Sequence, residues 1–192
     1  MKRTIKDFDL EGKKIIIRCD LNVPIENGVI TDDTRIVASL RTIKYALRFN
    51  TKIILLSHLG KIKTEEDKKK NSLYPVVERL REYLNTEVLF SPDTCSDRLT
   101  DMVNNMKEKS VLLIENTRFE DVPDKRESEC NDDLAKYWAS LGDIFINDAY
   151  GTCHRNHTSI TGIPKYLPSG VGFLVEKELQ KIDSVLDAKT HP

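Results

Sequence analysis

Residues 14–22 read Lys-Ile-Ile-Ile-Arg-Cys-Asp-Leu-Asn, a short apolar run that passes directly into charged and amide side chains. Further runs rich in Ile, Val and Leu follow at residues 52–56, 87–90, 110–114 and 143–146. Each run is nearly continuous, without the alternation of apolar and polar residues that marks a half-exposed strand. Such runs are typical of strands that are covered on both faces, as in a parallel sheet.

Amphipathic helical patterns separate these runs. Apolar residues three or four positions apart share one helix face over residues 36–47, 73–84 and 134–141. Gly142 follows the last of these patterns, where a glycine suits the end of a helix. Strands that alternate with helices imply right-handed crossovers and a parallel sheet. We therefore predict a doubly wound, Rossmann-like α/β fold, with helices on both faces of the sheet.

Two segments depart from this alternation. Asn27-Gly28 lies between two short apolar stretches, residues 23–25 and 29–31, and this pattern predicts a tight hairpin inserted after the first strand. Residues 61–71 are polar and dense in charge, so we expect a solvated loop there.

The length of 192 residues suits one domain with a sizeable core. A last helical pattern covers residues 174–186, and no strand or cap signal follows it. We therefore divide the chain into a domain of residues 1–172 and a helix of residues 173–192 that ends at a domain boundary.

Composition narrows the classes of function. Thirty Lys and Arg residues oppose 31 Asp and Glu residues, a net charge of -1, so no global field draws the protein to nucleic acid or a membrane. The apolar runs are too short to span a bilayer, and the first residues lack the apolar stretch of a signal peptide. Scattered cysteines without a Cys-x-x-Cys pair favour free thiols in a reducing compartment. We expect a cytoplasmic protein with neither nucleic-acid nor membrane partners.

Polar residues follow four of the predicted strands. The first run leads into Asp20-Leu21-Asn22, and the second into Ser-His-Leu-Gly-Lys at residues 57–61. The fourth leads into Glu-Asn-Thr-Arg at residues 115–118, and the fifth into Asn147-Asp148, with His154-Arg155 shortly beyond. Because ligands bind outside the carboxyl ends of the strands in an open α/β sheet, these clusters should meet at one edge.

The basic residues near this edge suit an anionic ligand. They are Arg35, Lys61, Arg118 and Arg155. Taken singly, each is adequately explained as a solvated surface charge, and Asp20 and Asn22 as turn residues. Taken together, the basic set could hold a small molecule with several negative charges, while Asp20 and Asn22 hydrogen-bond its hydroxyl group. The pattern favours a small hydroxylated phosphate or carboxylate.

Motifs for metals and nucleotide phosphates are missing from the sequence. No His-Glu-x-x-His motif, carboxylate cluster or cysteine set suggests a metal site. Neither Gly-x-x-x-x-Gly-Lys-Ser/Thr nor Gly-x-Gly-x-x-Gly occurs, and the nearest approach is Gly170-Val-Gly172. We therefore expect this chain to bind neither a metal ion nor a nucleotide cofactor.

The same clusters resemble the motifs of phosphoglycerate kinases, specifically of the amino-terminal half of that two-domain glycolytic enzyme. Residues 18–24 are similar to the family's Arg-Val-Asp-Phe-Asn-Val-Pro, and residues 114–119 to its Leu-Glu-Asn-Leu-Arg-Phe. Residues 147–157 resemble Asp-Ala-Phe-Gly-Thr-Ala-His-Arg-x-His, and residues 57–61 resemble Ser-His-Leu-Gly-Arg. In the last motif Lys61 replaces an arginine, so a point charge stands where the family has a planar fork.

The resemblance implies a substrate and the residues that contact it. The substrate is 3-phosphoglycerate or 1,3-bisphosphoglycerate. The implied contacts are Asp20, Asn22, Arg35, His58, Lys61, Arg118 and Arg155, with Leu21, Leu59 and Gly60 lining the loops. By the family pattern, Arg35 stabilises the transferring phosphoryl group, and His154 supports the residues that anchor the substrate's phosphate.

The resemblance also implies partners outside this chain. The family's carboxyl-terminal domain carries the nucleotide, Mg²⁺ with ATP or ADP, and a hinge brings the two domains together. We expect a monomer in which this chain supplies the substrate-binding amino-terminal domain. On its own it is expected to bind 3-phosphoglycerate weakly and to catalyse nothing.

Two other classes of function fit parts of the sequence. Residues 15–22 superficially resemble the strand and Asp-x-Asp nucleophile of an aspartyl-phosphate phosphatase, with Asp20 as the covalent catalyst. However, Asn22 stands where that class has its second aspartate. A non-catalytic anion-binding module is the other alternative, and it is compatible with the resemblance for a chain that lacks the nucleotide half.

Overall fold

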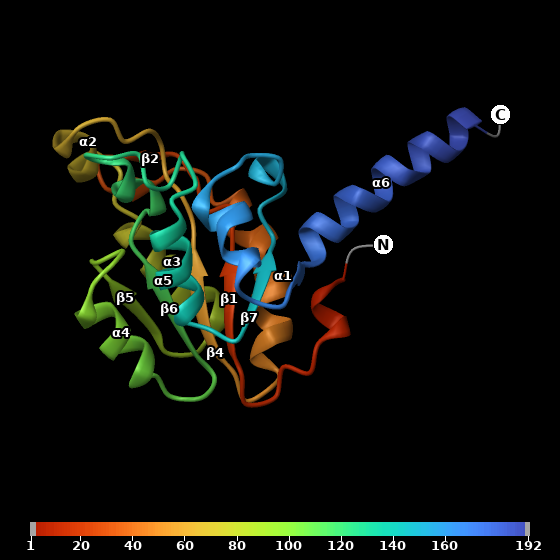
Figure 1. Cartoon of the computed structure of the whole chain (residues 1–192), viewed down its shortest axis with the longest axis horizontal. Helices are drawn as coiled ribbons and strands as arrows, with labels where there is room; N and C mark the ends of the chain where they lie inside the picture. The colour runs from red at the N-terminus through yellow and green to blue at the C-terminus, as the bar shows by residue number, and fades with distance from the viewer. Residues whose placement is uncertain (1–2, 191–192) are drawn as a thin grey trace.

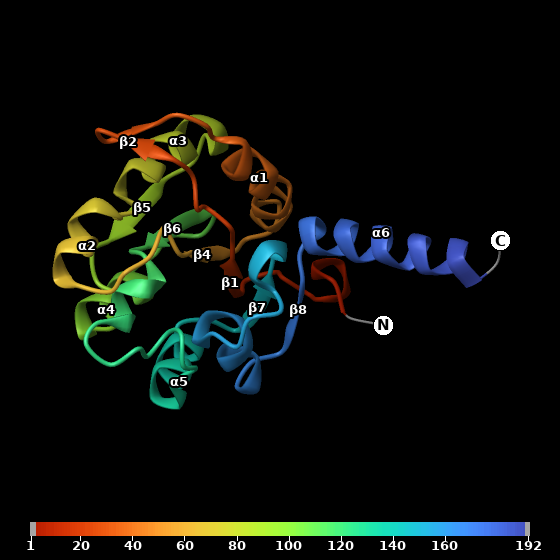
Figure 2. The same ribbon diagram turned by 90° about the horizontal axis from the view of Figure 1, so that it is seen from above.

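A parallel sheet lies at the centre of the computed structural model, which describes residues 3–190 (Figures 1 and 2). The strands are β1 (Lys14–Arg18), β2 (Ile25–Glu26), β3 (Val29–Ile30), β4 (Lys52–Leu56), β5 (Val88–Ser91), β6 (Ser110–Ile114), β7 (Ile144–Asn147) and β8 (Ser169–Val171). The helices are α1 (Thr34–Leu47), α2 (Glu65–Lys70), α3 (Tyr74–Leu84), α4 (Asp97–Asn104), α5 (Asp132–Ser140) and α6 (Phe173–Thr190). Within the described residues, the main sheet has six strands in the order β5-β6-β4-β1-β7-β8.

The strand order confirms the predicted doubly wound α/β fold. The chain leaves β1 toward β4 on one side and later returns to place β7 on the other side of β1. All the pairings in this sheet are parallel, and Arg18 at the end of β1 lies opposite Leu56 of β4 and Asn147 of β7. The carboxyl ends of β1, β4 and β7 therefore lie side by side.

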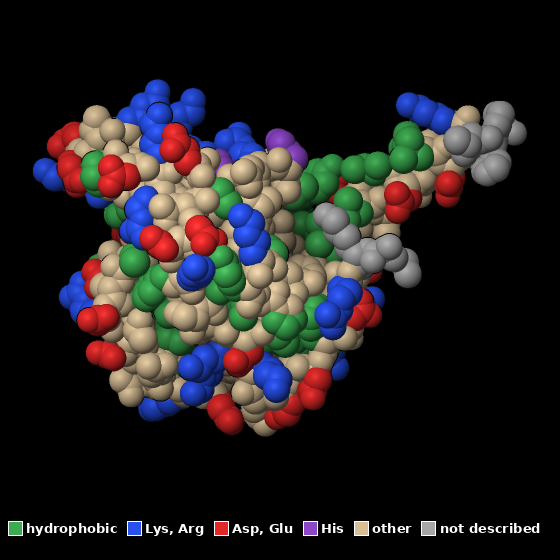
Figure 3. All heavy atoms as spheres, viewed as in Figure 1, with side chains coloured by type: hydrophobic (Ala, Val, Ile, Leu, Met, Phe, Trp, Pro, Cys, Tyr) green, Lys and Arg blue, Asp and Glu red, His purple; other side chains and the backbone are tan. Residues whose placement is uncertain are grey.

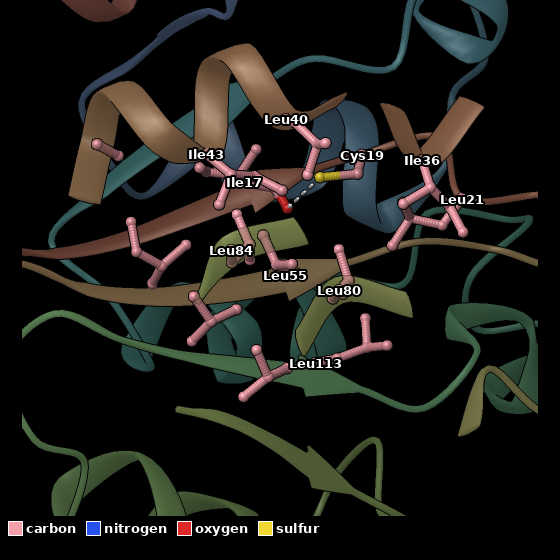
Figure 4. Packing of buried hydrophobic residues seen from close by; sticks show 14 of the residues in the cluster. Ile17, Cys19, Leu21, Ile36, Leu40, Ile43, Leu55, Leu80, Leu84 and Leu113 are labelled. Carbon is pink, nitrogen blue, oxygen red and sulfur yellow. Dashed lines mark hydrogen bonds between the residues drawn. The ribbon is translucent and has the colours of Figure 1, made fainter. Parts of the chain in front are cut away.

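Helices cover both faces of the sheet because successive strand side chains point to opposite sides. Ile15 and Ile17 of β1 pack with α1 and α3 on one face. Figure 4 shows Ile17 within this core. Ile16 packs with α4 and α5 on the other, beside the fully buried Trp138. Each fully buried Ile or Leu side chain is worth about 1.5–3 kcal/mol. The strands formed by the near-continuous apolar runs are thus buried on both faces of the sheet, as the sequence predicted.

The inserted hairpin is confirmed, and one predicted loop is wrong. Strands β2 and β3 pair in antiparallel fashion around Asn27 and Gly28, both of which have positive φ angles. Residues 61–71, predicted as a loop, contain α2. No α2 residue is buried, so apolar periodicity could not reveal the helix. A capping box joins Thr64 and Asp67 at its start, and ion pairs such as Lys68–Glu65 stabilise its exposed surface.

Helix α6 begins at Phe173, as predicted, and extends away from the body of the molecule (Figure 1). The last two residues of the predicted helix, 191–192, lie outside the described residues. Phe173 and Val175 are buried, whereas the helix is exposed from Gln180 onward through Lys189. The first turn of α6 thus belongs to the core, and the division of the chain at residue 172 stays a prediction.

The start of α6 is held by side chains from two other segments. The Thr42 hydroxyl in α1 accepts a hydrogen bond from the Phe173 amide at 3.0 Å, and Asp148 Oδ1 accepts one from the Leu174 amide at 3.0 Å. The Asp148 side chain is almost fully buried, and its Oδ2 atom has no hydrogen-bond partner among the described residues. Burial therefore raises the pKa of Asp148 from its ordinary 3.8 to about 6.

This shift predicts a pH-dependent stability that Asp148→Asn removes. Between about pH 4 and pH 6 the folded chain holds a proton on Asp148 that the unfolded chain has lost, so this group's contribution to stability falls as pH rises through that window. Two pKa units correspond to about 3 kcal/mol. We therefore expect the free energy of unfolding of the variant, relative to that of the wild type, to be about 3 kcal/mol higher at pH 7 than at pH 4. Urea unfolding at the two pH values measures this difference. An equal difference at both pH values would contradict this account.

Candidate anion-binding site

Loops that follow β1, β4, β6 and β7 meet at the carboxyl edge of the sheet, as predicted. The Leu21 amide donates to the Ser57 hydroxyl at 2.9 Å, which joins the loop after β1 to the end of β4. The Thr117 amide donates to the Ser57 carbonyl at 3.0 Å, which joins the end of β6 to the same point. Figure 3 shows Lys and Arg side chains, with histidine beside them, gathered along this edge at the top of the view.

Asn116 is the centre of the hydrogen bonds that hold these loops. Its side chain is fully buried, and Oδ1 accepts from the amides of Leu59 and Arg118 at 3.1 and 3.0 Å. Its Nδ2 donates to the carbonyls of Leu59 and Asn71 at 2.7 and 2.9 Å. One amide side chain therefore satisfies four backbone groups from three loops, and it fixes the path of the chain on both sides of Gly60.

A cavity of about 590 Å³ opens beside these loops. It is lined by Lys61, Arg118 and Arg155 of the predicted set, which come from the loops after β4, β6 and β7. Lys63, Lys125 and His157 line it as well, and Asp121 contributes one carboxylate. The lining therefore carries five Lys and Arg side chains against one acidic side chain, a strongly positive local environment in a chain of nearly zero net charge.

Arg118 is the best anchored of these cations. Its Nη1 atom donates to the Gly60 carbonyl at 3.3 Å, and its Nε atom is buried without a hydrogen-bond partner among the described residues. A buried guanidinium N–H without an acceptor is costly unless a ligand supplies one. The orphaned Nε atom is therefore a donor available to an anion.

Arg35, Asp20 and Asn22 lie outside the lining of this cavity and form a neighbouring group. Arg35 donates to the Asn22 carbonyl at 3.0 Å and lies 3.4 Å from the Asp20 carboxylate. Asn22 Oδ1 accepts from the Gly60 amide at 2.9 Å, so it contacts the loop that also meets Arg118. The Arg35 side chain is 54% exposed, so its pairing with Asp20 is weak and can be exchanged for a ligand.

The three histidines of the edge differ in their surroundings. His58 is buried, and burial together with Arg18 and Arg118 lowers its pKa to about 2. His157 lines the cavity, and its pKa is also lowered, chiefly by burial. His154, predicted to support the anchoring residues, is exposed and lies outside the cavity lining. Its supporting role stays a prediction.

The remaining members of the predicted set are loop residues that shape the edge. Leu21 and Leu59 are buried and belong to the core on the α1 side of the sheet. Gly60 has a φ of +60°, and a Cβ there would lie 2.4 Å from Asn71 Oδ1, so both the backbone conformation and the space favour glycine.

Some residues of the edge escaped sequence reasoning. His157 lies within the motif quoted at residues 147–157 but was not singled out from it. Lys63 and Lys125 are exposed lysines in polar segments and give no local signal. Asn116 was visible in the cluster after the fourth run, but four simultaneous backbone contacts depend on loops that are distant in the sequence.

The described residues offer no metal centre, and nothing about Asp20 favours the phosphatase alternative. Within residues 3–190, no group of three or more His, Cys, Asp or Glu side chains converges as a metal site would. Asp20 Oδ1 accepts from the Asn22 amide at 3.1 Å and faces Arg35, as in a turn. No helix among these residues is long and apolar enough to cross a membrane.

Fold and site together define an α/β protein with a basic cavity at the carboxyl edge of its sheet, and comparisons with known proteins give its family. The model of the family described as phosphoglycerate kinase matches residues 5–192. The chain therefore belongs to the phosphoglycerate kinase family.

Individual members of the family agree with this assignment. Over 192 residues the chain is 54% identical to a phosphoglycerate kinase of Enterococcus faecalis, and over 195 residues 51% identical to one of Fusobacterium nucleatum. These matches cover 100% of this chain but 48% and 49% of the relatives, so the chain spans about half their length.

Solved structures show the same similarity. The phosphoglycerate kinases of Coxiella burnetii and Pyrococcus horikoshii superpose with TM-scores of 0.80 and 0.79, at 34% and 31% identity. Each superposition covers 94% of this chain and 44% of the solved one.

Replacement of Asn116 should loosen the edge as a whole. Asn116→Ala leaves four backbone groups without their partner, and each buried unsatisfied group costs about 1–3 kcal/mol. We expect a loss of at least about 3 kcal/mol in the free energy of unfolding, measured by urea denaturation. Asn105→Ala is the matched control, because the exposed Asn105 makes one local bond to Asp101 and its loss should cost under about 1 kcal/mol. Equal losses in the two variants would contradict the role of Asn116.

Proposed function

We propose that this chain is the 3-phosphoglycerate-binding part of a phosphoglycerate kinase, the enzyme that transfers a phosphoryl group between 1,3-bisphosphoglycerate and ADP. Residues 1–172 would form the substrate-binding amino-terminal domain, and residues 173–192 would lead to the interdomain hinge. Two findings support this assignment: the chain belongs to the family, and it covers about half of the length of the relatives that it matches.

One observation carries the proposal. Lys61, Arg118 and Arg155 follow three different strands and line a single cavity of about 590 Å³. A phosphate monoester carries up to two negative charges and three acceptor oxygens, which this group of donors can match. The orphaned Nε atom of Arg118 would gain an acceptor on binding. In this proposal the three side chains anchor the substrate's phosphate, and His58 adds a hydrogen bond.

The neighbouring group of Asp20, Asn22 and Arg35 would hold the reacting end of the substrate. Asp20 and Asn22 would bond its hydroxyl and carboxylate groups, and Arg35 would turn from Asp20 to the transferring phosphoryl group. Phosphoryl transfer demands positioning and charge stabilisation more than covalent chemistry by the protein. Arg35 would thus be the catalytic residue of this chain.

The nucleotide would be bound elsewhere. ATP or ADP with Mg²⁺ would be held by a carboxyl-terminal nucleotide-binding domain, because the described residues offer no cluster of oxygen ligands for the ion. When bound, Mg²⁺ supplies charge neutralisation at the phosphates. We also propose that the enzyme is monomeric and cytoplasmic, that it acts in glycolysis and that its substrates are small molecules. The near-neutral net charge of this chain gives it no general attraction to nucleic acid or membranes.

Calorimetric titration tests the binding assignment directly. The chain should bind 3-phosphoglycerate more tightly than inorganic phosphate, because only the former engages both groups of residues. Arg118→Ala should weaken binding of 3-phosphoglycerate at least about tenfold, since a charge-assisted bond contributes about 1.5–3 kcal/mol. Equal affinity for the two anions would instead favour a non-catalytic anion-binding module.

We predict that Lys61→Arg raises the affinity for 3-phosphoglycerate. Arginine offers two parallel N–H donors where lysine offers a compact point charge, so the variant should bind 3-phosphoglycerate severalfold more tightly. Lys69→Arg, on the exposed surface of α2, is the control and should change nothing. Affinity that is unchanged or lower in the Lys61 variant would count against this role for the residue.

Catalysis should require both halves of the enzyme. This chain alone should form no ATP from 1,3-bisphosphoglycerate and ADP, whereas its mixture with a separately produced carboxyl-terminal half should do so. In the mixture, Arg35→Ala should lower turnover by about three powers of ten or more, the scale of arginine fingers in other enzymes. Its far-ultraviolet circular dichroism should match the wild type. ATP formation by this chain alone, or near-normal turnover of the variant, would refute the respective claim.

A further inference from the structure

A buried polar network lies at the inner end of the β1, β4 and β7 edge, and the proposed function does not use most of it. It contains Arg18, Glu127 and Ser159, all with 0% exposure, and His58 with 8%. Burial of an arginine and a glutamate is costly, so each needs partners that satisfy it. Arg18 and Glu127 are thus two charged side chains with no exposed surface that lie close to the edge.

The guanidinium of Arg18 has a partner for each of its nitrogens. Nε donates to Ser159 Oγ at 2.9 Å, Nη1 donates to the Cys19 carbonyl, and Nη2 lies 3.0 Å from His58 Nδ1. Ser159 in turn donates its hydroxyl to Glu127 Oε2 at 2.7 Å and its amide to Oε1 at 2.8 Å. The Glu127 carboxylate is thus connected to Arg18 through one hydroxyl group.

This arrangement determines where the proton of His58 lies. A guanidinium has five N–H donors and no acceptor, so Nδ1 of His58 must accept the bond from Arg18. A neutral imidazole with Nδ1 as acceptor carries its proton on Nε2. An imidazolium would place an N–H group against the N–H group of Arg18, which the geometry disfavours. Nε2 has no hydrogen-bond partner within residues 3–190, so it is the donor left for a ligand.

The surrounding charges act in the same direction. Arg18, Arg118, His157 and Arg155 all disfavour a positive charge on His58, in addition to its burial. Two carboxylates act on Arg18, first Glu127 and then Asp20, and Glu127 acts on His157 as well. Without Glu127, the buried guanidinium would lose the larger of its two compensating charges.

We propose that Arg18, held by Glu127 through Ser159, is a positioning residue that keeps His58 neutral with its proton on Nε2. His58 lies outside the residues that line the cavity, and it then presents a hydrogen-bond donor to an anion bound at this edge of the sheet at every pH from about 5 to 8, without adding a titrating charge. This inference rests on the proposed function for the identity of the anion. It goes further by assigning a role to Arg18, Glu127 and Ser159, which the proposed function does not use.

The first measurement is of the proton itself. Long-range ¹H–¹⁵N correlation spectra of the chain distinguish a protonated imidazole nitrogen from an unprotonated one. For His58 they should show Nε2 protonated, Nδ1 unprotonated and no titration between pH 5 and pH 8. Protonation of Nδ1, or titration in that range, would overturn the proposal even if 3-phosphoglycerate binds. Failure of 3-phosphoglycerate to bind would overturn the proposed function and leave this result standing.

The second measurement removes the network. In Arg18→Met/Glu127→Gln both buried charges are gone, so neither is left unpaired, and His58 loses the donor at Nδ1. We expect the pKa of His58 to rise toward its ordinary value, though not all the way, because burial and the other cations remain, and we expect the affinity for 3-phosphoglycerate to become more dependent on pH than in the wild type. Adding His58→Gln, which cannot titrate, should abolish that extra dependence.

A structural role alone would give a different result. It would lower the urea midpoint of the double variant without moving the His58 spectrum or the pH profile, and that outcome would contradict the proposal. Ser159→Ala provides a milder variant should the double replacement prevent folding. It removes the hydroxyl between Arg18 and Glu127 and leaves both charges in place. It should shift the His58 spectrum in the same direction as the double variant. An unaltered spectrum would count against the proposal that Glu127 holds Arg18 through Ser159.

Discussion

The parallel register of β1 with its two neighbours is the constraint on which the site depends. Arg18 lies opposite Leu56 on one side and Asn147 on the other, so the three strands end at the same level. Loops that are far apart in the sequence must then begin side by side. A slip of one residue would turn the strand side chains to the opposite faces and disturb the packing of both core clusters. The energy of the two cores therefore fixes the position of the cations at the edge.

Gathering cations at one edge is unfavourable in itself, and the fold compensates in two ways. Neutral hydrogen bonds centred on Asn116 fix the loops without adding charge. Glu127 supplies a buried carboxylate that is connected to Arg18 through the Ser159 hydroxyl. Neither Asn116 nor Glu127 is among the residues that line the cavity, so the lining stays positive. The Nε atom of Arg118 has no hydrogen-bond partner among the described residues, and in the proposed function an anion would supply one.

The sequence predicted those features whose signal is local and repeated. The strands of the main sheet from β1 to β7 and the helices α1, α3 and α5 were anticipated because their apolar residues recur with a clear period. Helix α4 escaped because its buried face is limited to Leu99 and Val103, and α2 escaped because it buries nothing. Strand β8 has three residues, too few for a period. Convergence of Lys61, Arg118 and Arg155 followed from topology, whereas the roles of Arg18 and Asn116 needed contacts between distant segments.

Chemical-shift mapping of the backbone amides with 3-phosphoglycerate tests the central claim most directly. We predict that the largest changes fall on Gly60, Arg118 and His157 and extend to Asn22, because these residues surround the basic cavity and its neighbouring group. Inorganic phosphate at the same concentration should affect a smaller part of this set. Changes confined to another part of the surface, such as the groove between Lys6 and Glu176 at the start of α6, would contradict the account.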